Sequence, residues 1–138
     1  MPATPRVLDF DVSVDRDGTA ASGVDGSELE REGAWSAEHF VLAGLVRCTL
    51  TSLAHAAKRA EVEVVASGRA HGRVTKREED GLYAFVEIES SYDVDVSPPL
   101  APAALADLLA RAERGCFVGN SLTARPTYRW TVNGAEVE

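Results

Sequence analysis

The longest regular pattern in the chain is a helical one that spans residues 35–60. Apolar side chains recur there at helical spacing, at Val41, Leu45, Cys48, Leu53 and Ala57. Ser36 is a suitable N-cap, and Glu38 would place a carboxylate in the first turn, where the helix dipole favours negative charge. A helix of about 25 residues would be about 37 Å long. Because its apolar positions lie on more than one side, the pattern predicts a helix at the centre of the fold.

Before this helix, apolar and polar residues alternate over residues 6–14. The alternation places Leu8, Phe10, Val12 and Val14 on one side, as expected for a half-buried strand. Asp17-Gly18 is a strong signal for a two-residue hairpin turn, so residues 19–24 are expected to return as a second strand. A short polar link over residues 25–33 then leads into the helix.

After the helix, residues 62–75 and 82–96 have the β-branched and alternating composition of two strands. An Asp-Gly pair at residues 80–81 supplies the tight turn between them. Gly68 and Gly72 interrupt the first strand and indicate a bend or a bulge. We therefore expect a long antiparallel hairpin that covers one side of the helix.

A second helix is predicted to begin at Pro102 and to end at Gly115. Its apolar stripe consists of Leu105, Leu108, Leu109 and Ala112. A final short strand follows over residues 126–132. The order of elements, β-β-α-β-β-α-β, predicts an α+β fold with a mainly antiparallel sheet.

Composition narrows the class of function. The chain has 138 residues and is expected to be a single domain, and its net charge of −8 argues against tracking nucleic-acid phosphates or anionic lipid. Its first ten residues lack the apolar run of a signal peptide, and no stretch is expected to reach membrane-spanning length, so we expect a cytoplasmic protein. Cys48 and Cys116 are the only cysteines and show no CxxC spacing, so we expect no metal site and no cofactor.

Four residues stand in an order that resembles the OsmC/Ohr superfamily of thiol-dependent peroxidases. These are Arg16 of an Arg-Asp-Gly in the first hairpin, Glu38 and Cys48 with nine residues between them, and Cys116 in the segment CFVGNSL. The resemblance implies a peroxidatic Cys48, a resolving Cys116 and an activating pair formed by Arg16 and Glu38. It also implies an intertwined homodimer with the long helices at its centre and the sheets wrapped outside.

The chemistry of a thiol peroxidase can also be argued from the residues. Only a thiolate attacks a peroxide, and Cys48 lies too deep in its helix for the dipole to ionise it, so it needs a nearby cation such as Arg16. A carboxylate such as Glu38 would aim that guanidinium. Ten residues of helix separate Glu38 from Cys48 by about 15 Å, so we expect Arg16 and Glu38 to come from the partner chain. Cys116 would then close a disulfide, which an external dithiol must reduce.

Other interpretations of these residues stay open. Phe40, Leu45 and Phe117 are candidates to line a pocket for the organic part of a hydroperoxide, or they are core residues. The cysteines could be inert core residues of a non-catalytic dimeric module. A hot-dog-type thioesterase also wraps a sheet around a long helix, but here a second helix interrupts the strands. The sequence leaves open which peroxide and which reductant are the natural ones.

Overall fold

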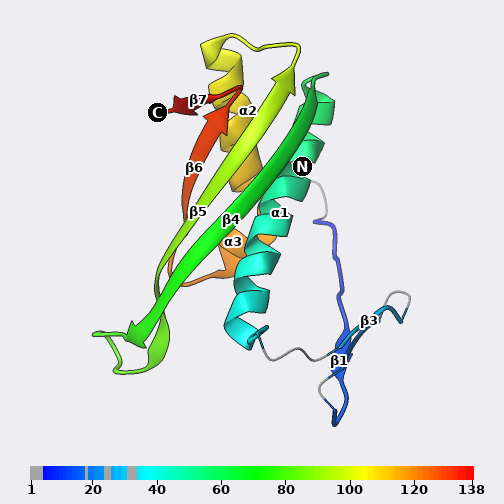
Figure 1. Cartoon of the computed structure of the whole chain (residues 1–138), viewed down its shortest axis with the longest axis vertical. Coiled ribbons are helices and arrows are strands. Elements are labelled where there is room, and N and C mark those ends of the chain that lie inside the picture. The colour runs from blue at the N-terminus through cyan, green and yellow to red at the C-terminus, as the bar shows by residue number, and fades with distance from the viewer. Residues whose placement is uncertain (1–4, 18, 24–25, 31–33) are drawn as a thin grey trace. The chain divides into compact units, whose positions relative to one another are not determined.

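The computed structural model describes residues 5–17, 19–23, 26–30 and 34–138. They form two compact units, Met1–Ala37 and Glu38–Glu138, which we describe separately (Figure 1). Both contain β-sheet, and the second also contains the helices.

The first unit is a three-stranded antiparallel sheet in the order β1-β2-β3. Its strands are β1 (Val12–Val14), β2 (Ala20–Ser22) and β3 (Glu28–Leu29). The predicted hairpin is confirmed, with Val14 opposite Ala20, although both strands are shorter than the alternation suggested and Gly18 and Val24 lie outside the described residues. The Asp15 carboxylate shapes the turn, since it accepts the backbone N–H groups of residues 17 and 19 at 2.9 and 3.0 Å. The strand β3 corrects the expectation of a simple polar link over residues 25–33.

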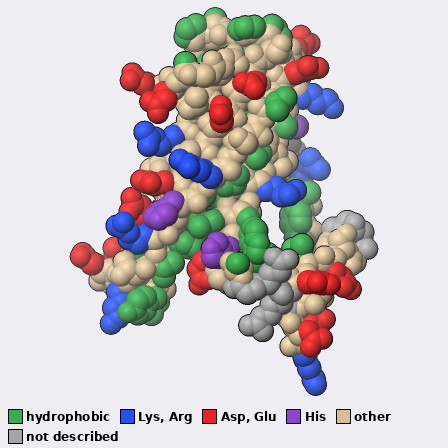
Figure 2. All heavy atoms as spheres, in the orientation of Figure 1, with side chains coloured by type: hydrophobic (Ala, Val, Ile, Leu, Met, Phe, Trp, Pro, Cys, Tyr) green, Lys and Arg blue, Asp and Glu red, His purple; other side chains and the backbone are tan. Residues whose placement is uncertain are grey.

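The apolar side of this first strand is exposed in the single chain. The expectation of a half-buried strand is therefore wrong for the single chain. Phe10 is 79% exposed and Val12 is 72% exposed. Alternation reports that one face of a strand is apolar, but a three-stranded sheet without a second layer does not cover that face. Figure 2 shows hydrophobic side chains on the surface together with charged side chains of both signs.

The second unit contains one four-stranded sheet and the helices. Its elements are α1 (Ala37–Arg59), β4 (Glu63–Lys76), β5 (Tyr83–Ser97), α2 (Pro102–Arg114), α3 (Phe117–Ser121), β6 (Thr127–Val132) and β7 (Ala135–Val137). The predicted long helix, long hairpin, second helix and final strand are all present, and α3 and β7 are additional elements. Pro102 stands in the first turn of α2, and the backbone N–H of Gly115 caps its end by bonding to the carbonyl of Arg111 at 3.0 Å.

The sheet order is β4-β5-β6-β7. β4 and β5 pair antiparallel along almost their whole length, and so do β6 and β7, whereas β5 and β6 are parallel. The parallel pair follows from the chain path, because α2 and α3 form the crossover that a parallel connection requires. The prediction of a mainly antiparallel sheet is therefore confirmed, with one parallel pair at its centre.

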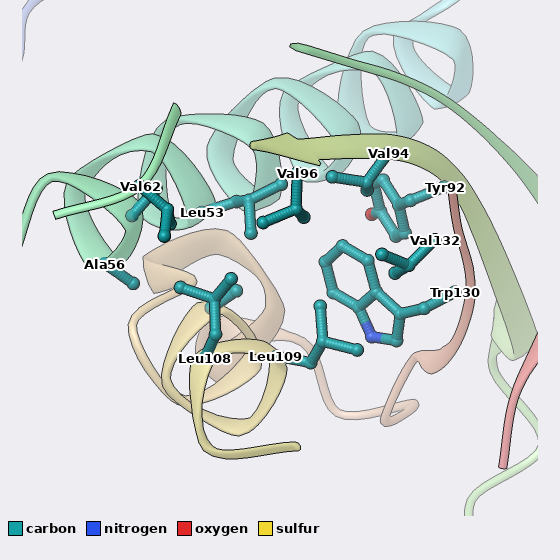
Figure 3. Packing of buried hydrophobic residues seen from close by; sticks show 12 residues of the cluster. Leu53, Ala56, Val62, Tyr92, Val94, Val96, Leu108, Leu109, Trp130 and Val132 are labelled. Carbon is teal, nitrogen blue, oxygen red and sulfur yellow. The ribbon is translucent and has the colours of Figure 1, made fainter. Parts of the chain in front are cut away.

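The main hydrophobic core lies between one face of this sheet and the two longer helices. Its buried residues are Leu53, Ala56, Ala57, Val62, Tyr92, Val94, Val96, Leu108, Leu109, Ala112, Trp130 and Val132. In Figure 3 the strand residues Tyr92 and Trp130 face Leu109 of α2, and Leu53 of α1 lies beside Val96. The rings of Tyr92 and Trp130 stack at 4.7 Å between centroids. Packing of both helices on one face leaves the charged side chains of the strands on the other.

The two glycines of β4 have no side chain and so leave room for aromatic rings of β5. A Cβ atom at Gly68 would lie 2.7 Å from the Tyr92 ring, and one at Gly72 would lie 2.5 Å from the Phe85 ring. The pairing register shifts between residues 73 and 74, so the predicted bulge occurs, one residue after Gly72. Gly68 lies in regular pairing opposite Tyr92.

The helix α1 is long and apolar enough to cross a membrane by length and composition alone. The expectation that no stretch reaches membrane-spanning length is therefore wrong. In this fold the helix supplies Leu45 and Leu53 to the interior, and both are fully buried. Of the most apolar window of this helix, 28% is buried inside the structure.

Candidate functional site

The fold brings Cys48 and Cys116 together in a second, smaller hydrophobic cluster. Cys48 lies in the middle of α1 and is partly exposed, whereas Cys116 stands at the N-cap of α3 and is 0% exposed. Leu45 and Ile88 complete the buried part of this cluster. Cys48 packs against this cluster, and the Cys116 thiol lies close enough to raise the pKa of Cys48. Both are free thiols.

Short-range polar contacts hold Cys116 in place. Its Sγ lies 3.2 Å from the Thr49 hydroxyl of α1, and it accepts the backbone N–H of Gly119 at 3.4 Å. The carbonyl of Cys116 accepts the N–H of Asn120 at 3.0 Å, which closes the turn of α3. The end of α2 at Gly115 and this capped turn together direct the thiol back toward α1.

Opposing influences act on the Cys48 thiol. Burial is the largest and raises its pKa, and the charge and hydrogen bond of Cys116 raise it further. The backbone N–H groups of Val118 and Phe117 face the sulfur and lower the pKa, but the net shift is upward. None of these influences is a positive charge. Within the described part of a single chain, the surroundings of Cys48 therefore favour the thiol over the thiolate.

Two tyrosines of the sheet lie beside the thiols. Burial raises the pKa of Tyr128, and the neighbouring Cys116 raises it further. The Tyr128 hydroxyl occupies the space that a side chain at position 119 would fill, which explains the need for glycine there. Burial also raises the pKa of Tyr92, and the nearby hydroxyls of Ser90 and Thr49 lower it. Its buried hydroxyl makes no hydrogen bond of good geometry among the residues that the structure describes.

The sequence predicted both thiols of this cluster but not the groups around them. Thr49, Gly119 and Tyr128 were not singled out. A signal for Thr49 was available, because it is a polar residue four positions after Leu45 on the apolar side of the helix. Gly119 and Tyr128 depend on how α3 returns to the sheet, for which the sequence offered no comparable signal.

The proposed activating pair lies elsewhere in the chain. Arg16 belongs to the first unit, and Glu38 is an exposed residue in the first turn of α1. Because α1 is continuous from Ala37 to Arg59, Glu38 and Cys48 are separated by about 15 Å along the same helix. The roles of Arg16 and Glu38 therefore stay predictions.

The three residues proposed for a substrate pocket differ in their surroundings. Leu45 is fully buried, and its carbonyl accepts the hydroxyl of Thr49 at 2.9 Å, so it serves the core and the thiol cluster. Phe117 is 60% exposed although its own N–H faces Cys48. Phe40 is also exposed, two turns before Cys48 on α1. Of the three, Phe117 combines an exposed side chain with a backbone N–H that faces the partly exposed thiol.

Comparisons with known proteins identify the family and the fold of the chain. The sequence matches the family model described as OsmC-like protein over residues 25–131. Similar solved structures include an OsmC-like protein of unknown function from Vibrio cholerae, with a TM-score of 0.78, 16% identity, and coverage of 91% of this chain and 100% of that one. An organic hydroperoxide resistance protein from Elizabethkingia anophelis gives a TM-score of 0.63 at 18% identity, covering 94% and 96%.

A third similar structure is the organic hydroperoxide resistance protein OhrB of Bacillus subtilis. It gives a TM-score of 0.58 at 17% identity, covering 93% of this chain and 98% of that one. None of the curated proteins compared with the sequence matches it. At these identities the structural likeness establishes the fold.

Proposed function

Because the chain belongs to the OsmC-like protein family, we propose that it is a thiol-dependent peroxidase that reduces organic hydroperoxides. The observation that carries this proposal is the pairing of two free thiols from helices far apart in the sequence, one partly exposed and one fully buried. This difference in exposure suits a peroxidase. The attacking sulfur must be accessible to the peroxide, and the resolving sulfur must lie next to it without reacting first. Two of the similar structures are named organic hydroperoxide resistance proteins, which supports the same class of substrate.

In the first step, the Cys48 thiolate attacks one oxygen of the hydroperoxide. The O–O bond breaks, the leaving alkoxide takes a proton and departs as an alcohol, and Cys48 becomes a sulfenic acid. The N–H groups of Phe117 and Val118 face the sulfur and stabilise its negative charge. The exposed ring of Phe117 offers an apolar surface for the organic part of the peroxide.

In the second step, Cys116 attacks the sulfenic sulfur and forms a disulfide with Cys48, and water leaves. An external dithiol then returns both residues to thiols. Neither step uses a metal ion or a bound cofactor. We place this chemistry in the cytoplasm, where thiol reductants are maintained.

The upward pKa shift of Cys48 is the reason for proposing a second chain in the site. Its surroundings in the second unit oppose ionisation, so an additional cation is required. In the proposed homodimer, Arg16 of the partner subunit approaches Cys48, and Glu38 of the partner subunit orients the guanidinium. The exposed apolar side of the first strand, with Phe10 and Val12, is surface that a second copy would cover.

The test of the proposed function is peroxide reduction with cumene hydroperoxide, t-butyl hydroperoxide and hydrogen peroxide, with dithiothreitol or dihydrolipoamide as reductant. Cys48→Ser is expected to abolish turnover, because the nucleophile is lost. In the Cys116→Ser variant, peroxide is expected to oxidise Cys48, but the intramolecular disulfide cannot form. Mass spectrometry of the wild type after one equivalent of peroxide should find a Cys48–Cys116 disulfide. Two unmodified thiols, or full turnover by Cys48→Ser, would instead favour the inert dimeric module.

The shared site has its own test by complementation. Arg16→Ala chains keep Cys48, and Cys48→Ser chains keep Arg16, so each homodimer lacks one part of every site. Co-expression of the two variants should restore activity, because a mixed dimer contains one complete site. If the guanidinium acted within its own chain, the mixture would stay as inactive as the separate variants.

A further inference from the structure

Thr49 is a fully buried polar residue that immediately follows Cys48 on α1. Its hydroxyl makes two contacts, at 2.9 Å to the carbonyl oxygen of Leu45 and at 3.2 Å to Sγ of Cys116. A threonine in this position would satisfy its hydroxyl through the first contact alone, by bonding back to the preceding helical turn. The second contact links α1 directly to the buried thiol of the candidate site.

The direction of the second hydrogen bond follows from counting protons. A hydroxyl has one hydrogen to donate, and the Leu45 carbonyl can only accept, so the hydrogen of Thr49 is used there. With that hydrogen used, Thr49 Oγ1 can accept the S–H of Cys116 at 3.2 Å, a shorter contact than the 3.9 Å from the same sulfur to the Leu45 carbonyl oxygen. The N–H of Gly119 donates to the same sulfur at 3.4 Å.

Two of the three free directions around Cys116 Sγ are thus assigned. Its proton is directed to Thr49, and one lone pair receives the N–H of Gly119. Cys48 and the Tyr128 hydroxyl are further neighbours of this sulfur. A lone pair of Cys116 Sγ must form the new bond when Cys116 attacks an oxidised Cys48.

We propose that Thr49 is a positioning residue for disulfide formation, which it prepares by accepting the S–H of Cys116 and so holding this sulfur beside Cys48. This inference rests on the proposed peroxidase function. In the step concerned, the S–S bond forms, the S–O bond of the Cys48 sulfenic acid breaks, and the Cys116 proton leaves with that oxygen as water. The Cys48 sulfur is reduced and the Cys116 sulfur is oxidised, so no further reactant is needed.

The same hydrogen bond also favours the reduced state of the pair. A disulfide has no S–H, so oxidation removes the bond that Thr49 accepts. Loss of the Thr49 hydroxyl should therefore have two effects of opposite kind. The disulfide should form more slowly, and at equilibrium with a thiol–disulfide buffer it should be more populated.

The experiment compares Thr49→Val, which lacks the hydroxyl, with Thr49→Ser, which keeps it. Thr51→Val is the matched control, since Thr51 is an exposed threonine on the same helix. After rapid mixing with cumene hydroperoxide, dimedone labels the Cys48 sulfenic acid and mass spectrometry follows its conversion to the disulfide. Equilibration with reduced and oxidised dithiothreitol gives the stability of the disulfide without any peroxide.

In Thr49→Val, sulfenic acid formation should match the wild type while disulfide formation slows about tenfold, the effect of a hydrogen bond worth about 1.4 kcal/mol. The disulfide should also be favoured about fivefold more in the dithiothreitol equilibrium. Thr49→Ser should restore both values, and Thr51→Val should change neither. Disulfide formation at the wild-type rate in Thr49→Val, or an unchanged equilibrium, would overturn the inference. Failure of the peroxidase proposal is distinguishable, because the wild type would then give no sulfenic acid at Cys48.

Discussion

The two hydrophobic clusters of the second unit use the same helix for different purposes. The C-terminal half of α1 contributes Leu53 to a large, mainly apolar core with α2 and the sheet. Its middle contributes Leu45 and Cys48 to a small cluster that also contains Cys116. The small cluster contains two thiols, one of them partly exposed, whereas the large one contains neither and consists mostly of aliphatic and aromatic side chains. The C-terminal half of α1 thus packs into the main core, and the middle of the same helix carries the thiol of the candidate site.

The sharpest way to test this division is to truncate one residue of each cluster to alanine. Leu53→Ala should lower the free energy of unfolding by about 2–5 kcal/mol, because it leaves a cavity in fully buried packing. Cys48→Ala should cost less than about 1 kcal/mol, because the thiol is small and partly exposed. Both replacements put the best helix-forming residue into the same helix, so helix propensity does not explain the difference. Urea denaturation measures both, and equal losses would show that the thiol cluster is part of the structural core.

Much of the fold could be predicted from the sequence, because the relevant patterns are local. The helical spacing over residues 35–60 anticipated α1 within two residues at each end. Alternation and the Asp-Gly turn at residues 80–81 anticipated the β4–β5 hairpin. The first strand shows the limit of such patterns. Its apolar alternation is real, but periodicity cannot tell whether the covering layer comes from the same chain or from another one.

The candidate site was predictable only in part. The order of Arg16, Glu38, Cys48 and Cys116 pointed to the two thiols, and the fold brings the thiols together. Thr49 was missed because a threonine among apolar helical positions is common and its contact with Cys116 spans 67 positions of the chain. The fit of Tyr128 against Gly119 was missed for a similar reason. It depends on the path of α3 between α2 and β6, which no short motif encodes.

The smallest expected effect concerns the balance between burial and the two backbone amides at Cys48. In an Arg16→Ala variant, which lacks the proposed cation, the Cys48 pKa should lie above the ordinary value of 9.0 for a cysteine thiol, because burial outweighs the N–H groups of Val118 and Phe117. The rate of Cys48 alkylation by iodoacetamide should then reach half of its maximum above pH 9, and at lower pH in the wild type. A pKa raised on folding means that the folded chain keeps a proton that the unfolded chain has lost. The free energy of unfolding should therefore fall as pH rises from the unfolded pKa through the folded one, whereas Arg16→Ala with Cys48→Ser should lack that fall. Half-maximal alkylation below pH 9 in Arg16→Ala would show that the amides alone overcome burial, and the thiol would then need no second chain.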